Sequence, residues 1–186
     1  MTIVCNLYGG PGTGKSTNAT YVFSQLKRQG IVAEYVSEYA KDITWEETHS
    51  LLNNQIHLFS EQFRRQWRLL NKVDVIVTDS PLLLGLVYFE HYITNDSNFT
   101  IEFEKCIKST IYNGFLQFDN LNYFLIREKE YVKIGRNQTE SEAIELDSEV
   151  KEVLNRYNVD YNTIKTSVEE MDNTVIPDII KKLNNR

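Results

Sequence analysis

A glycine-rich stretch near the start of the sequence constrains this chain more than any other feature. Gly9, Gly14, Lys15 and Ser16 fit the pattern G-x-x-x-x-G-K-[ST], and an apolar run typical of a buried strand, Ile3–Tyr8, precedes the loop. The glycines let the backbone curl so that successive N–H groups point at phosphate oxygens, and the following helix adds its positive dipole end. The pattern therefore predicts a phosphate-binding loop that takes a nucleoside triphosphate.

The side chains of this loop have expected roles toward the nucleotide. Lys15 would reach the β- and γ-phosphates, and the Ser16 hydroxyl would be a ligand of Mg²⁺. The Asn-Lys-x-Asp pattern that reads guanine does not occur, and adenine has no equally clear signature, so these patterns leave the base of the donor open. The expected cofactors are ATP and Mg²⁺. The residues expected to bind the triphosphate are Gly10, Gly12, Thr13, Gly14, Lys15, Ser16 and Thr17.

The composition fits one soluble domain over residues 1–186, with no membrane contact and a cytoplasmic location. Of the 186 residues 41% are hydrophobic and 25% charged, and no apolar run approaches the ~18 residues of a membrane helix. Cys5 and Cys106 lack metal-binding spacing, and Cys5 lies in the expected first strand, as a buried free thiol would. The formal charge of −6 argues weakly against a broad nucleic-acid surface.

Apolar, β-branched runs alternate with amphipathic helical patterns along the rest of the chain. Further strands are expected at 31–36, 73–79, 121–126 and 162–168, and helices at 18–29, 56–70, 139–157 and 175–183, with a mostly helical segment at 82–114. This alternation predicts an α/β fold with a parallel five-stranded sheet flanked by helices. Because ligands of such sheets lie at the carboxyl ends of the strands, Glu38, Asp79 and Arg127 should meet the phosphate loop in one cleft.

Two carboxylates are candidates for metal binding and proton transfer. Asp79 ends an apolar strand, which suits a carboxylate beside the Mg²⁺ held by Ser16, in direct contact or through water. Asp79-Ser80-Pro81 is also typical of a helix start, so Asp79 could instead, or in addition, cap the following helix. Glu38 lies just beyond the second strand, where it could take a proton from an attacking hydroxyl, and a solvated loop glutamate is the alternative.

Arginines after the fourth strand are the candidate groups for charge stabilisation. Arg127 and Arg136 flank a polar segment, and a lid over about residues 127–140 could close over the triphosphate and exclude water. An exposed loop is the alternative explanation of this segment. The residues expected to act in catalysis are Lys15, Glu38, Arg127 and Arg136.

The helix expected at 56–70 has two distinct faces. The apolar face, which should pack on the core, holds Ile56, Phe59, Phe63, Trp67 and Leu70. The opposite face holds Gln62, Arg64, Arg65 and Arg68. These arginines could bind an acceptor's phosphate or a nucleic-acid backbone, but a solvated helix face is the better explanation.

The order of these features resembles the P-loop nucleoside and nucleotide kinases. Ser37-Glu38-Tyr39-Ala40-Lys41 is similar to the Glu-Tyr-Ala-Arg stretch of ribosylnicotinamide kinase domains, and the chain resembles the small P-loop kinases of that type encoded by bacteriophages. The resemblance implies the P-loop NTPase fold, with Glu38 as base and Asp79 at the metal or the acceptor. It also implies that Arg127 and Arg136 act as lid arginines.

This resemblance leads to an expected activity with two alternatives. The expected activity is an ATP-dependent kinase that moves the γ-phosphoryl group to a hydroxyl of a small nucleoside-like acceptor: a nucleoside, a nucleotide or ribosylnicotinamide. Nucleotide kinases often carry Asp-Arg where this chain has Asp79-Ser80, which favours an acceptor without a phosphate at that spot. The alternatives are a phage-type kinase acting on hydroxymethyluracil bases in DNA, and a P-loop switch ATPase. The oligomeric state is open, and a homodimer is compatible with the sequence.

Overall fold

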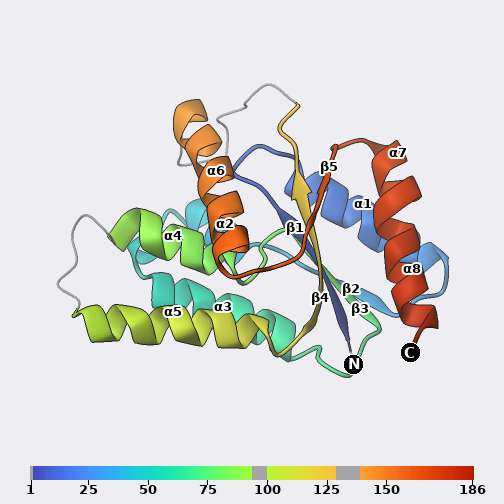
Figure 1. The fold of residues 1–186 in the computed structure, drawn as a ribbon, viewed down its shortest axis with the longest axis horizontal. Helices are drawn as coiled ribbons and strands as arrows, with labels where there is room; N and C mark the ends of the chain where they lie inside the picture. Colours follow the sequence, from blue (N-terminus) through green and yellow to red (C-terminus); the bar gives the residue numbers. More distant parts are fainter. Residues whose placement is uncertain (1, 94–99, 129–138) are drawn as a thin grey trace.

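The chain folds into a parallel sheet with helices on both faces (Figure 1). The computed structural model describes residues 2–93, 100–128 and 139–186. Within them, the sheet has five strands: β1 (Ile3–Tyr8), β2 (Ala33–Val36), β3 (Val75–Thr78), β4 (Asp119–Leu125) and β5 (Asn162–Ile164). The helices there include α1 (Lys15–Arg28), α2 (Tyr39–Trp45), α3 (Gln55–Trp67), α4 (Leu84–Ile93), α5 (Ile101–Phe115), α6 (Glu140–Arg156), α7 (Val168–Glu170) and α8 (Ile176–Asn184). The predicted α/β fold with a five-stranded parallel sheet is confirmed.

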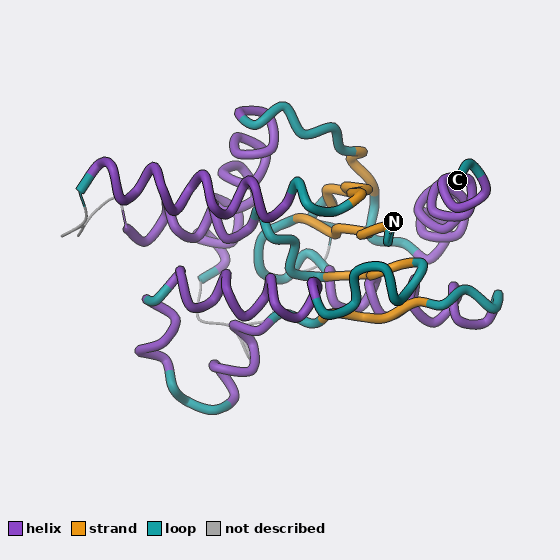
Figure 2. Tube along the Cα trace, turned by 90° about the horizontal axis from the view of Figure 1, so that it is seen from below, coloured by secondary structure: helices purple, strands orange, loops and turns teal. Residues whose placement is uncertain are grey.

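Side chains alternate along β1 between two apolar layers. Val4 and Tyr8 pack in the layer formed with α3, α4, α5 and α6, whereas Cys5 and Leu7 pack in the layer formed with α1 and α8. This period of two follows from the pleat of a strand, and it explains why a strand buried on both sides is mostly apolar. Figure 2 shows helices on both sides of the strands. Cys5 is a buried free thiol, as expected.

The order of the strands, β2-β3-β1-β4-β5, places β1 at the centre of the sheet. Asn6 of β1 pairs with Thr78 of β3, which in turn pairs with Val36 of β2. On the other side, Tyr8 of β1 pairs with Phe124 of β4. All neighbours are parallel, so the segments that follow these four strands leave the sheet at the same edge, where ligands of such sheets bind.

The face of α3 that packs against the protein differs from the expected one. Its buried residues are Gln55, Gln62 and Gln66, whereas Ile56 and Trp67 are 39% and 47% exposed. The expected placement of Gln62 on the solvated side is therefore wrong, whereas the other members of the apolar face are half-buried against the core. Polar contacts with the segment after β2 orient this helix, and its aromatic rings cover the edge of the core instead of filling it.

Two further boundaries differ from the sequence prediction. The strand expected at 162–168 ends at Ile164, and α7, a π-helical turn (Met171–Val175) and α8 then follow one another. The helix after β3 begins only at Leu84. In the described part of the chain, no helix combines the length and the apolar character needed to cross a membrane.

Candidate active site

The phosphate-binding loop connects β1 to α1. Gly14 immediately precedes α1 with a φ of 89°, in the left-handed region that favours glycine, and Gly12 has a φ of 85°. Inside the loop, the Thr13 hydroxyl donates a hydrogen bond to the carbonyl oxygen of Gly10 at 3.0 Å. Helix α1 begins at Lys15, so its free N–H groups point toward the loop, where they favour an anion.

Lys15 lies against this loop and is surrounded by charged groups. Its amine donates hydrogen bonds to the carbonyl oxygens of Gly9 and Gly10, at 2.7 and 2.9 Å. Burial lowers the pKa of Lys15, while the carboxylates of Glu38 and Asp79 oppose the shift. The structure therefore brings together the lysine and both carboxylates that the sequence analysis singled out.

Glu38 lies two residues after β2, at the cap position of α2. Burial raises the pKa of Glu38 above its ordinary range, and Lys15 opposes the shift. The side chain of Gln62 hydrogen-bonds to the backbone on both sides of Glu38. It accepts the Tyr39 N–H at 3.0 Å and donates to the Ser37 carbonyl oxygen at 3.3 Å. A carboxylate with a raised pKa on a fixed backbone suits a general base.

Asp79 follows β3 directly and is only 2% exposed. Its Oδ1 atom has no hydrogen-bond partner among the described residues, so one buried acceptor is available to a cation. Because α4 begins at Leu84, five residues later, Asp79 does not cap that helix. The Tyr35 hydroxyl interacts with the side chains of Asp79 and Ser16, which places these two expected metal ligands close to each other.

The protein itself offers few ligands for Mg²⁺ at this site. In the described ranges, no three His, Cys, Asp or Glu side chains gather into a metal-binding group. A divalent cation here would depend on Ser16, Asp79, water and the phosphates of a bound nucleotide, as Mg²⁺ does when it is bound together with phosphates. The orphaned carboxylate oxygen beside Ser16 fits such an ion.

Arg127 lies two residues after β4 and reaches the phosphate loop. Its Nη1 donates to the carbonyl oxygen of Pro11 at 2.8 Å, and its Nη2 to that of Ala143 at 3.0 Å. Its Nε donates to the carboxylate of Asp147 at 2.8 Å. Arg136, and with it residues 129–138 of the expected lid, lies outside the described residues. Ser16 and Thr17 lie in the first turn of α1.

Arg64 and Arg65 of α3, and Arg68 just after it, make their contacts outside this site. Arg64 binds Glu61 through a 2.7 Å ion pair at the surface, and Arg68 is exposed. Arg65 is the exception to the expected solvated face, because it pairs with Asp42 at 2.6 Å and its guanidinium lies over the Tyr39 ring at 4.8 Å. These contacts fix α3 to the segment that carries Glu38.

Three residues of this site were missed by the sequence analysis: Tyr35, Gln62 and Asp147. Strand alternation could have found Tyr35, because it shares with Ala33 the face of β2 that packs on α1. Gln62 was placed on a solvated face, and nothing in the sequence distinguishes Asp147 from the other acidic residues of α6. Each of these side chains reaches the site through tertiary contacts.

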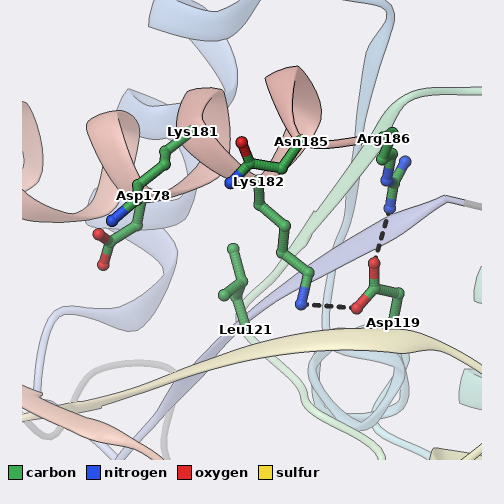
Figure 3. A pocket seen from close by; sticks show the side chains of 7 residues that line it. All are labelled: Asp119, Leu121, Asp178, Lys181, Lys182, Asn185 and Arg186. Atoms are coloured by element: carbon green, nitrogen blue, oxygen red, sulfur yellow. Dashed lines mark hydrogen bonds and ion pairs between the residues drawn. The ribbon is translucent and has the colours of Figure 1, made fainter.

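A hollow lies at the opposite end of the sheet from the phosphate loop. It has a volume of about 500 Å³ and is lined by Asp119, Leu121, Asp178, Lys181, Lys182, Asn185 and Arg186 (Figure 3). Asp119 binds Lys182 at 2.6 Å and Arg186 at 2.8 Å. Because Asp119 begins β4 and Arg127 follows its end, this hollow is separate from the phosphate-loop site.

Comparisons with known proteins agree with this fold. A search of curated proteins gave no match. A solved structure described as the crystal structure of NadR protein in complex with NR is similar, with a TM-score of 0.68 and 16% identity. The match covers 100% of this chain and 52% of that chain, so this chain spans about half its length. At this identity the likeness shows the fold alone, and the P-loop fold predicted from the sequence is confirmed.

A family model is matched over most of the chain. The model described as AAA domain matches residues 4–171, from β1 to the turn before α8. The matched range contains the phosphate loop, Glu38, Asp79 and Arg127. The chain therefore belongs to the AAA domain family and has the P-loop NTPase fold, in the form that resembles P-loop kinases.

Proposed function

We propose that this protein is an ATP- and Mg²⁺-dependent kinase that transfers the γ-phosphoryl group to a hydroxyl of a small, nucleoside-like acceptor in the cytoplasm. The observation that carries this proposal is the meeting of Lys15, Glu38 and Asp79 at one edge of the sheet. Phosphoryl transfer needs a cation at the phosphates, a metal ligand and a base for the acceptor, and these three side chains supply them. The resemblance of residues 37–41 to ribosylnicotinamide kinase domains supports the class of acceptor.

In the proposed reaction, Glu38 takes the proton of the acceptor hydroxyl as the hydroxyl oxygen attacks the γ-phosphorus. A P–O bond to the acceptor forms, the bond between the γ-phosphorus and the β,γ-bridging oxygen breaks, and ADP leaves. Lys15 neutralises charge on the phosphates, with Arg136 proposed to assist there and Arg127 proposed to assist through its contact with the phosphate loop. Mg²⁺, held by Ser16 and Asp79, would supply further charge neutralisation.

A label-transfer assay tests this proposal. Purified protein is incubated with γ-labelled ATP and Mg²⁺ together with nucleosides, nucleoside monophosphates, ribosylnicotinamide, or DNA with and without hydroxymethyluracil. Label on one small acceptor is the expected result. Lys15→Ala should nearly abolish transfer, whereas Lys27→Ala, in the last turn of the same helix, should not. Glu38→Gln should lose transfer but keep nucleotide binding, with the exposed Glu34→Gln as its control.

The AAA domain description favours a second candidate, an ATPase in which water takes the place of the acceptor. Label that appears only as free phosphate, with every acceptor in the panel, would support this candidate and refute the kinase. Label on DNA that contains hydroxymethyluracil, and on no small molecule, would instead identify DNA as the substrate. Each outcome thus assigns a different reaction to the same site.

A further inference from the structure

Arg127 and Asp147 connect the phosphate loop to α6. The Asp147 carboxylate accepts the backbone N–H of Gly10 through Oδ1 and the Arg127 Nε–H through Oδ2. Arg127 in turn donates to the carbonyl oxygens of Pro11 in the loop and Ala143 in α6. The two side chains are 14% and 17% exposed, so this ion pair is largely shielded from water. We call these two residues the loop clamp.

The space between Gly10 and the loop clamp leaves no room for a side chain. A Cβ atom at Gly10 would lie 2.5 Å from the Ala143 carbonyl oxygen, 2.9 Å from the Asp147 carboxylate and 3.2 Å from Arg127 Nη2. Gly10 lacks the positive φ of Gly9, Gly12 and Gly14, so close approach, not backbone conformation, explains its glycine. The phosphate-loop pattern allows any residue at this position. The close contact with Asp147, Arg127 and Ala143 therefore explains why position 10 is a glycine.

The clamp and Lys15 hold the same piece of backbone. Lys15 donates to the carbonyl oxygens of Gly9 and Gly10 from within the loop, while Asp147 holds the Gly10 N–H from outside. A displacement of Gly10 would therefore displace the anchor of the Lys15 amine. Three hydrogen-bond donors of Arg127 are already in use, and its charge is balanced by Asp147.

We propose that Arg127 and Asp147 are positioning residues, which hold the first half of the phosphate loop in the shape that binds nucleotide. In this arrangement Arg127 acts through the loop backbone and not by direct contact with the phosphates. Asp147 is then as necessary for nucleotide binding as Arg127. This inference rests on the proposed function, because it concerns the same nucleotide site.

The test is a double-mutant cycle on nucleotide affinity. A fluorescent, non-hydrolysable ATP analogue with Mg²⁺ is titrated into the full chain and into Arg127→Met, Asp147→Ala and the double variant. We expect each single variant to bind roughly tenfold more weakly, and the double variant to bind no more weakly than either single, because the residues act as a unit. Asp147→Asn, which can still accept the Gly10 N–H, should lose less than Asp147→Ala.

Controls separate positioning from general loss of structure. All titrations are made well below the unfolding midpoint of each variant, since breaking a buried ion pair also lowers stability. Asp119→Asn breaks a comparable pair with Lys182 and Arg186 at the far end of the sheet, and should leave the affinity unchanged. Gly10→Ala tests the contact from the loop side and should weaken binding, whereas Gly85→Ala, with its nearest neighbour at 3.7 Å, should not.

Two results would overturn the positioning role of Arg127 and Asp147. If Arg127→Met loses affinity while Asp147→Ala binds as tightly as the unmodified chain or more tightly, Arg127 contacts the phosphates directly and the inference is overturned. Additive losses in the double variant would overturn it as well. If the unmodified chain does not bind the analogue, the proposed function fails before the inference is reached, so the two failures are distinguishable.

Discussion

Replacing Gln62 with methionine tests how the candidate base is held. Gln62 is 6% exposed, and its amide accepts the Tyr39 N–H and donates to the Ser37 carbonyl oxygen, on either side of Glu38. Methionine has nearly the same length and volume, so the packing of α3 should change little. The substitution therefore removes two hydrogen bonds and leaves the apolar contacts of the helix in place.

The expected loss follows from these two bonds. Each buried hydrogen bond contributes about 1 kcal/mol net, so Gln62→Met should lower the free energy of unfolding by about 2 kcal/mol. For a domain of this size, 1 kcal/mol corresponds to roughly 2–4 °C in the unfolding midpoint, which gives about 4–8 °C. Glu38 would also lose its fixed backbone, and kcat should fall roughly tenfold while KM for ATP changes little.

Urea and thermal unfolding measure the loss of stability, and steady-state kinetics measure the loss of kcat. Gln117→Met is the matched control, because Gln117 is an exposed glutamine two residues after α5 whose side chain donates a hydrogen bond to the Asn113 carbonyl oxygen. The control should shift neither the unfolding midpoint nor kcat. If Gln62→Met matches the unmodified chain in both measurements, its two bonds do not hold the Glu38 segment and the reasoning is wrong. A loss of stability with unchanged kcat would refute only the positioning of the base.

Two further predictions concern charge. The positive charge of Lys41 opposes the rise in the pKa of Glu38, so Lys41→Met should raise that pKa further and move the acid limb of kcat/KM to higher pH. Lys72→Met, in the turn before β3 at the other end of the sheet, should leave the limb in place, and an unmoved limb in both variants would argue against Glu38 as base. Hydrogen bonds from Arg64 and Arg65 lower the pKa of Glu61 from 4.5 to about 2. The resulting stability is present above about pH 4.5 and is lost as the pH falls toward 2, so the difference in urea midpoint between Glu61→Gln and the unmodified chain should narrow over that range. A difference that is independent of pH would contradict this assignment.

Most of the fold could be predicted because its signals are local. The phosphate loop is specified by four residues within eight positions, and the central strands are mostly apolar because both of their faces are buried. The parallel order then follows from the alternation of strands and helices. Topology alone was enough to predict that Glu38, Asp79 and Arg127 reach the same edge of the sheet.

The ends of the helices were less predictable, and the start of α4 decided between two roles of Asp79. Asp79-Ser80-Pro81 fits a helix start, and only the position of Leu84 as the first residue of α4 shows that Asp79 does not cap it. Residues Pro81 to Leu86 form overlapping turns with hydrogen bonds three residues apart before the regular helix is established. Propensity does not fix such a boundary, because several starting points differ little in local energy.

The contacts that the sequence could not reveal share a physical reason. Gln62 binds the backbone of residues 37 and 39, and Asp147 binds the backbone N–H of Gly10, 137 residues away in the chain. A backbone N–H or carbonyl group is the same at every position, so it leaves no complementary residue type for a sequence pattern to show. On their helices, Gln62 and Asp147 each have the polar character of a solvated position. Both side chains instead form hydrogen bonds to backbone groups that lose their sheet partners where the chain leaves a parallel strand. In this fold those ends are also the site, so the side chains that satisfy the loop backbone are the ones expected to control how the nucleotide is bound.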